Sequence, residues 1–366
     1  MNPYFNLRAF GALTGEVVIS PSRPLIPSGI VLITPNLGQE TPVTEVHAKS
    51  SSAGVVFNGP EIDGYKTGGL FLSYLYGELF TDDKYGVYVA RAFAEIKNSK
   101  MRVAFGLNGD VINPRAPNTI NFNRANGAGN LGFFRGQFLL ENYFYPHKGA
   151  QITTQIAISD PVTTSFTNFD RLPLELLEEH RWPNLEARVL LAMGSQPANA
   201  AMPRPFELGV SGLVGQLRRT SFPNNRIHDV WAVGADFHLA LGQAVGFNGE
   251  FFTGQCIGNY NAAIFLVDNT NLVPIRSTGG WVEMYVNWSS SWHSHFGCGI
   301  DDPLDRTLTA ELPTKNRVAF ANLIWDVNRS LEIGFELSHW DTDYASPGPN
   351  IDNDAMVYHT RVSVKF

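Results

Sequence analysis

The chain has 366 residues, of which 44% are apolar, 12% aromatic and only 17% charged. Soluble domains carry about 25% charged residues, so this composition argues against an ordinary water-exposed surface. A net charge of −7 without a basic block argues against nucleic-acid binding, and two cysteines are too few for a disulfide framework.

Helical signals are nearly absent. No run of 18 apolar residues exists, so we expect no transmembrane helix. The one helical candidate, residues 172–180, is short and ends at Pro183, and we predict a helical turn within a loop. No secretory signal precedes the first expected strand, so export would depend on a signal that this sequence does not contain.

Alternation of apolar and polar residues, broken by Gly, Pro, Asn and Asp, runs through the rest of the chain and predicts strands. Segment 28–34 also has strand character, but we place it in a loop. We predict sixteen strands, at residues 4–20, 44–60, 65–81, 84–98, 100–112, 130–146, 150–160, 184–195, 205–221, 225–241, 243–256, 278–289, 292–302, 315–328, 329–343 and 355–366.

The lengths of the connections alternate between short and long. After even-numbered strands they are short, with the exception of 196–204. After odd-numbered strands most are long, and the short ones are 82–83 and 222–224. This alternation predicts that neighbouring strands are antiparallel, with short turns at one end of the sheet and long loops at the other. An even number of strands places both termini at the short-turn end. Outer-membrane barrels have short periplasmic turns and long extracellular loops in this way.

The last strand shows the expected faces most clearly. Residues 356–366 alternate an apolar face, which includes Met356 and Phe366, with a polar face. On this segment alone, the last strand of a soluble sheet fits equally well. Across the chain, however, no helices are available to cover the apolar faces, and lipid removes that need. We therefore predict an all-β protein, a single transmembrane antiparallel β-barrel domain over residues 1–366, with aromatic girdles on its outer surface.

Two blocks of sequence resemble the DcaP-like trimeric porins. The first is S-S-S-A-G-V-V-F-N-G-P-E at 50–61 with G-L-F-L-S-Y-L-Y-G-E-L-F at 69–80. The second is A-F-G-L-N-G-D-V-I-N-P at 104–114 with G-A-G-N-L-G-F-F-R-G-Q at 127–137, where Arg135 and Gln137 match an R-x-Q pattern. The resemblance covers about residues 44–145 and the C-terminal strand. It implies a sixteen-stranded homotrimer for passive uptake of small hydrophilic, often anionic, solutes. Family members usually carry a coiled coil before the barrel, which this chain lacks.

The expected strand faces place charged residues toward a lumen wide enough to hold water. Arginines fall on the fourth to eighth strands and carboxylates on the tenth to fifteenth, which form opposite walls. We hypothesise a transverse field that orients solutes. Scattered, solvated charges are the alternative, because Glu95, Glu141 and Glu186 lie on the basic wall. The predicted pore-lining residues are Arg91, Arg102, Arg135, Gln137, Arg188, Asp236, His238, Glu250, Glu283, Glu332, Glu336 and Arg361.

The segment 113–129 is long, polar and rich in Asn and Gly, and loops of this length are usually functional. We predict that it folds into the lumen and narrows it, presenting Arg115, Asn121 and Arg124. A cap over the outer mouth is the alternative, and the family resemblance favours the constriction.

No metal site and no cofactor are expected. His293 and His295 share one strand face and His238 points toward the same lumen, but no third ligand is in register. Two other functions stay open: a plugged structural or adhesive barrel, and a barrel hydrolase using Ser294 with His339. A soluble all-β protein is the alternative at the level of the fold.

The expected location is the outer membrane. The partners expected there are lipid and lipopolysaccharide, and the assembly machinery that reads a C-terminal strand ending in Phe366, whereas no nucleic acid is expected.

Overall fold

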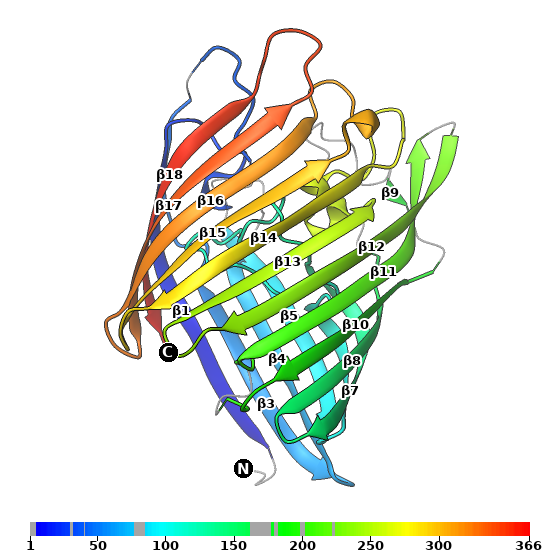
Figure 1. Cartoon of the computed structure of the whole chain (residues 1–366), viewed down its shortest axis with the longest axis vertical. Coiled ribbons are helices and arrows are strands. Elements are labelled where there is room, and N and C mark those ends of the chain that lie inside the picture. Colours follow the sequence, from blue (N-terminus) through cyan, green and yellow to red (C-terminus); the bar gives the residue numbers. More distant parts are fainter. Residues whose placement is uncertain are drawn as a thin grey trace.

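The computed structural model describes residues 5–29, 32–39, 41–76, 85–161, 177–178, 182–197, 202–221 and 224–366. They form one closed antiparallel sheet of sixteen long strands, the predicted fold class (Figure 1). No helix in the described residues is long and apolar enough to cross a membrane. The barrel strands are β1 (Asn6–Ser20), β3 (Ser52–Ile62), β4 (Tyr65–Tyr76), β5 (Tyr85–Lys97), β6 (Met101–Gly109), β7 (Phe134–His147), β8 (Ala150–Ser159), β10 (Asn184–Met193), β11 (Phe206–Ser221), β12 (Asn224–Ala240), β13 (Val245–Gln255), β14 (Arg276–Asn287), β15 (Trp292–Pro303), β16 (Pro313–Asp326), β17 (Leu331–Tyr344) and β18 (Asn353–Lys365).

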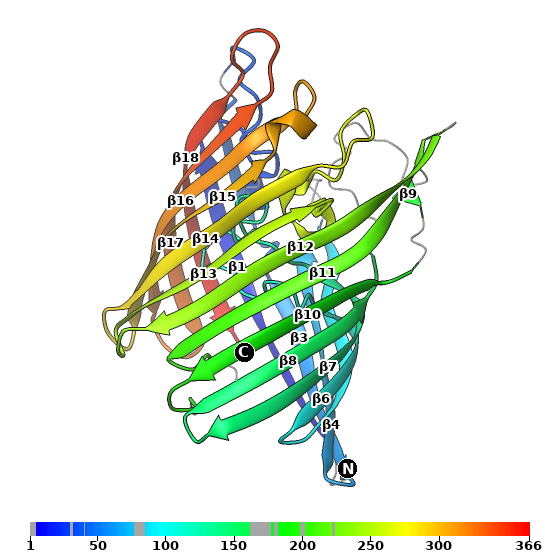
Figure 2. The same cartoon turned by 45° about the vertical axis from the view of Figure 1, so that its right-hand side comes forward.

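Closure joins the first strand to the last. β1 pairs with β18 from Ala12↔Lys365 to Ile19↔Tyr358, and the Gly11 amide donates to the Phe366 carbonyl at 3.1 Å. Apart from 44–60, each predicted strand overlaps an observed one to within a few residues, and 77–81 of the third lies outside the described residues. The turns between β3 and β4 and between β7 and β8 are two residues long, and the long connections gather at the other end of the barrel (Figures 1 and 2).

Two local predictions were wrong. The strand predicted at 44–60 is divided into β2 (Val43–His47) and β3, because the Ser51 hydroxyl accepts the Thr14 amide at 2.9 Å where a ladder bond would continue. β1 therefore pairs with β2 at one end and with β3 at the other. The helical turn predicted at 172–180 lies mostly outside the described residues, and its described part is strand β9 (Leu177–Glu178), which pairs with β11.

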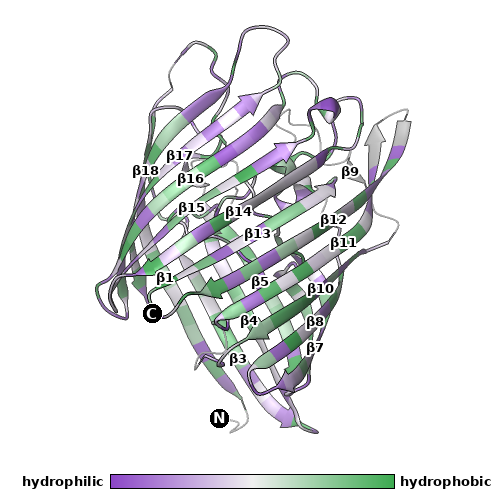
Figure 3. Cartoon of the chain, in the orientation of Figure 1, coloured by the Kyte–Doolittle hydropathy of each residue, from purple (hydrophilic) through white to green (hydrophobic). Residues whose placement is uncertain are grey.

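The strand faces follow the predicted alternation. On β18, Met356, Tyr358 and Val362 are exposed, whereas Val357 and His359 are buried. Figure 3 shows green apolar bands alternating with purple polar bands along many strands. Because the exposed face is apolar on strand after strand, this surface fits a lipid environment better than water.

Three exposed tryptophans lie at the short-turn end, whereas Trp182, also exposed, precedes β10 at the opposite end. Trp288 follows β14, and Trp292 stacks on Trp325 of the neighbouring strand with ring centroids 5.2 Å apart. These three indoles sit where an aromatic girdle is expected. Trp281 and Trp340 are instead buried on the inner face, so they do not contribute to a girdle.

Candidate pore constriction

The connection between β6 and β7, residues 110–133, turns back into the barrel interior (Figures 1 and 2). Its two ends are tied together at the base. The Asp110 amide donates to the Phe133 carbonyl at 3.0 Å, and the Phe133 amide donates to Asp110 Oδ2 at 2.8 Å. The segment between them therefore leaves and re-enters the sheet at one point and is free to extend across the lumen.

Arg135 fixes this base. Its guanidinium forms a bidentate ion pair with Asp110, donates to the Asn259 carbonyl at 3.0 Å, and lies 3.7 Å from the Tyr260 ring centroid. Arg135 is only 1% exposed. Its side chain faces inward, as expected, but it is enclosed by these partners. Gln137, two residues along β7, donates to the Gly109 carbonyl at 2.6 Å and so supports the same corner.

Four glutamates on the inner face of the barrel hold the rest of the loop. Each comes from a different strand, namely β10, β13, β14 and β17, and each accepts hydrogen bonds from successive backbone amides of residues 111–121. The bonds are Val111 and Ile112 to Glu186, Arg115 to Glu250, Asn118 to Glu283, and Ile120 and Asn121 to Glu336.

These carboxylates accept hydrogen bonds from the loop amides, as the carbonyl groups of a neighbouring strand do within a sheet. A backbone amide that is buried without a hydrogen-bond partner is costly, and these carboxyl groups supply the partners of the loop amides. Three of these glutamates, Glu250, Glu283 and Glu336, belong to the predicted acidic wall, and they are bonded to the loop that lies against them. The transverse field remains a prediction, with the loop placed between the two walls.

Arg115 connects the loop to the middle of this wall. Its guanidinium pairs with Asp236 at 2.7 Å and with Glu207 at 2.7 Å. Arg188 also pairs with Asp236, through two bonds of 2.7 and 2.8 Å. Two arginines and two carboxylates thus neutralise one another, so this part of the lumen contributes little net charge.

An open cavity of about 350 Å³ lies between the loop and the opposite wall, formed by β4 to β8. Four arginines line it, Arg91, Arg102, Arg115 and Arg124, against the carboxylates Asp110 and Glu141. Arg102 is paired with Glu95 and Glu141, at 2.6 and 3.1 Å.

Arg91 and Arg124 form no ion pair with any described residue. Arg91 lies over the Phe134 ring, 5.6 Å from its centroid, and Arg124 is exposed. The cavity is therefore cationic in balance, and these two guanidinium groups are its uncompensated charges.

The other predicted lumen residues lie near the lower part of the loop. Arg361 donates to the Ile120 carbonyl at 3.2 Å and pairs with Glu332 at 2.9 Å. Asn121 is buried, and His238 lies within 2.6 Å of the Asn248 amide oxygen, with its ring stacked on Tyr285. None of these is among the residues that line the cavity.

His293 and His295 point inward together, as their spacing predicted. Their rings meet at 3.2 Å between Nδ1 and Nε2. His295 Nδ1 lies 3.6 Å from Glu283, the residue that binds Asn118. A short row of polar side chains therefore runs from β15 to the loop.

A second loop also folds inward, and it was not predicted from the sequence. Residues 256–275, between β13 and β14, form two 3-10 turns, η3 (Gly258–Tyr260) and η4 (Ala263–Phe265), and most of their side chains are buried. This loop supports the constriction from above: the Gly132 amide donates to the Tyr260 carbonyl at 2.7 Å. The apolar run 264–267 inside an otherwise polar connection was the available signal, because apolar loop residues must be buried somewhere.

The structure does not support the hydrolase alternative, which needs Ser294 and His339 to lie within hydrogen-bonding distance. In the sheet register, Cys298, Ala319 and His339 share one row across β15, β16 and β17. Ser294 is four residues along β15 from that row, so it lies roughly 16 Å from His339, given about 3.3 Å per residue and 4.8 Å per strand. No proton can pass directly between them.

No protein-family model matches the sequence, and no curated protein is similar to it. Several solved structures share its fold. The outer membrane channel DcaP of Acinetobacter baumannii superposes with a TM-score of 0.76 at 14% identity, over 100% of this chain and 99% of that one. An anion-selective porin from Comamonas acidovorans gives 0.61 at 9% identity, over 99% and 100%. OmpF of Salmonella typhi gives 0.58 at 12% identity, over 98% and 97%. These similarities define the fold as the sixteen-stranded porin barrel.

Proposed function

We propose that this protein is an outer-membrane porin, a passive diffusion channel for small hydrophilic solutes with a preference for anions. The observation that carries the proposal is the open, arginine-lined cavity beside a loop that crosses the lumen. A plugged barrel would have no such space. The two uncompensated guanidinium groups, Arg91 and Arg124, act as the anion-attracting charges.

The outer surface supports a membrane location. Its apolar strand faces and tryptophans match what lipid requires, and a closed barrel leaves no unpaired sheet edge in the hydrocarbon. The resembled family and the neighbours with this fold are outer-membrane proteins, and one neighbour, OmpT of Vibrio cholerae, is described in a trimer form. We therefore propose an outer-membrane location and a homotrimer in contact with lipid and lipopolysaccharide.

Residues 113–129 are proposed as the constriction. The supporting observation is their bonding to Glu250, Glu283 and Glu336 on the far wall, which holds them across the lumen and not over its mouth. Solutes then pass through the cavity on the arginine side. In this pathway the protein binds and releases solutes without chemical change, so no catalytic residue is required.

The direct test is reconstitution in a planar lipid bilayer under a salt gradient. We expect stepwise conductance, in groups of three for a trimer, with a reversal potential of the sign that anion selectivity gives. Replacing both uncompensated charges (Arg91→Gln with Arg124→Gln) should move the reversal potential toward cation selectivity. Arg317→Gln is the matched control, since Arg317 pairs with Asp341 and Asp343 away from the cavity.

Two results would count against the proposal. Folded protein that gives no conductance would favour a plugged structural or adhesive barrel. Conductance whose reversal potential is the same in the double variant and the wild type would show that Arg91 and Arg124 do not set selectivity.

A further inference from the structure

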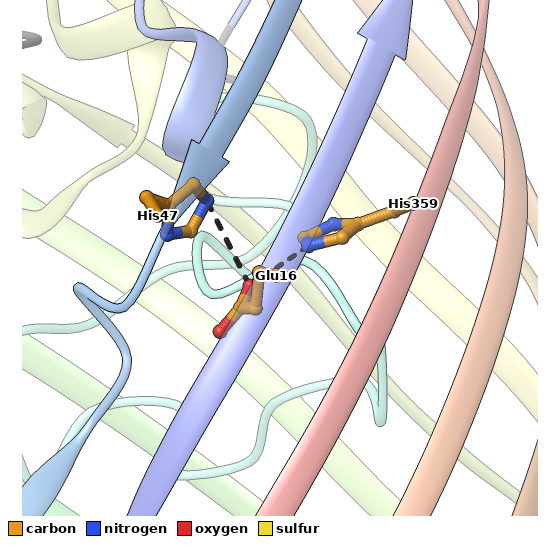
Figure 4. Close-up of side chains that lie close together, drawn as sticks. All are labelled: Glu16, His47 and His359. Atoms are coloured by element: carbon orange, nitrogen blue, oxygen red, sulfur yellow. Dashed lines mark hydrogen bonds and ion pairs between the residues drawn. The ribbon is translucent and has the colours of Figure 1, made fainter.

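Three side chains converge on the inner face of the barrel at the seam where its first strand meets its last. Glu16 is in the middle of β1, His47 ends β2, and His359 is on β18. Figure 4 shows the two imidazoles on either side of the carboxylate. All three residues are less than 5% exposed. They come from segments far apart in sequence, so only closure of the barrel brings them together.

The atoms available as ligands are close to one another. His359 Nε2 is 2.8 Å from Glu16 Oε2, and His47 Nε2 is 3.9 Å from the same oxygen. One ligand atom from each residue lies within 4.8 Å of the other two. In a tetrahedral zinc site with bonds of about 2.0–2.1 Å, neighbouring ligand atoms are roughly 3.3 Å apart. The cluster is therefore near the dimensions of a metal site before any side chain moves.

The local charge favours a cation. Glu16 and Glu336 both lie beside His359, and Glu336 is its direct partner across β17 and β18. In the part of the chain that the structure describes, neither carboxylate forms an ion pair with an arginine or lysine. The adjacent Lys49 is already paired with Glu45 at 3.1 Å. A buried carboxylate is compensated by a proton, on the carboxyl itself or on an imidazole, or by a metal ion.

We propose that Glu16, His47 and His359 bind one divalent transition-metal ion of the Zn²⁺ class, with a fourth position left for water. Two imidazole nitrogens and one carboxylate oxygen form a donor set that such ions prefer over Ca²⁺ or Mg²⁺. The inference does not rest on the pore function, because the site lies in the wall and not among the cavity residues.

The hydrogen bonds of the imidazoles show what binding requires. His359 Nδ1 and His47 Nε2 have no hydrogen-bond partner among the described residues. His47 Nδ1 accepts the Lys49 amide at 3.3 Å. A metal at His47 Nε2 needs the ring proton on Nδ1, so this long bond is lost on binding. It belongs to the break between β2 and β3, residues 48–51, where no ladder bond depends on it.

Metal binding would connect β1, β2 and β18 through one ion. These contacts would span both the closing seam between β1 and β18 and the break between β2 and β3. The ion would therefore stabilise the folded barrel and not the unfolded chain.

The test uses the folded barrel in detergent, stripped with a chelator and titrated with Zn²⁺ against a chromogenic competitor. We expect one Zn²⁺ per chain, a rise in the melting temperature on addition of Zn²⁺, and a visible absorption band typical of four-coordinate Co²⁺ when Co²⁺ is used. His47→Gln, His359→Gln and Glu16→Gln should each weaken binding at least 10-fold. His339→Gln, a histidine on β17 that pairs with Asp354, should leave binding unchanged.

Heat-modifiable gel mobility verifies that each variant is folded. The proposal is overturned if the folded wild type binds no Zn²⁺, or if His47→Gln and His359→Gln bind as tightly as the wild type. It is also overturned if His293→Gln abolishes binding while the three cluster variants do not, because the ion would then occupy the other histidine pair. Each of these results is independent of whether the barrel conducts ions.

Discussion

Replacing Glu336 by glutamine should loosen the far end of the constriction loop. Glu336 accepts the Ile120 amide at 2.7 Å and the Asn121 amide at 3.4 Å, one on each carboxylate oxygen, and it is 1% exposed. Glutamine keeps one acceptor oxygen and presents an NH₂ group in place of the other. One loop amide therefore faces an NH₂ group and loses its acceptor, and the other keeps an acceptor oxygen.

The size of the effect follows from this loss. A hydrogen bond contributes about 0.5–1.5 kcal/mol, and a buried donor left without an acceptor costs about 1–3 kcal/mol. We estimate a net change of about 2 kcal/mol for local attachment of the loop, which corresponds to roughly a 30-fold larger detached population.

Single-channel recording measures this directly. Glu336→Gln should increase open-channel noise and admit larger neutral solutes in a liposome-swelling assay. Glu95→Gln is the charge-matched control: Glu95 faces the lumen and pairs with Arg102 and Lys97, with no bond to the loop. If both variants show wild-type noise and the wild-type size limit, the glutamates do not hold the loop, and the reasoning is refuted.

Three further changes test other contacts. Arg135→Met leaves Asp110 buried without its partner and should lower stability by about 3–5 kcal/mol, seen as a lower melting temperature; an unchanged midpoint would contradict the ion pair. Gly129→Ala should displace the loop and raise the conductance, because Gly129 has φ +111° and an added Cβ would lie 2.1 Å from the Gly280 carbonyl oxygen. Wild-type conductance would argue against that approach. Deleting Phe366 removes the two backbone bonds to Gly11, at 3.0 and 3.1 Å, and should reduce the folded barrel recovered from outer membranes; wild-type recovery would show that closure does not need this residue.

Much of the barrel was readable from the sequence because its signals are local. A strand exposes alternate residues to lipid, so the period-two pattern at 356–366 fixes both the element and its faces. The alternating lengths of the connections predicted that neighbouring strands are antiparallel. Inward placement of Arg91, Asp236 and Glu336 follows from the same alternation.

What the inward residues contact was decided only by the tertiary structure. The partners of Glu336 are 215 and 216 positions away in the chain, and Arg135 meets Asn259 at a separation of 124. Alternation gives the direction of a side chain, but the register between strands and the path of each loop determine which charges meet. The same holds for Glu16 and His359, which come together only because the first and last strands close the barrel.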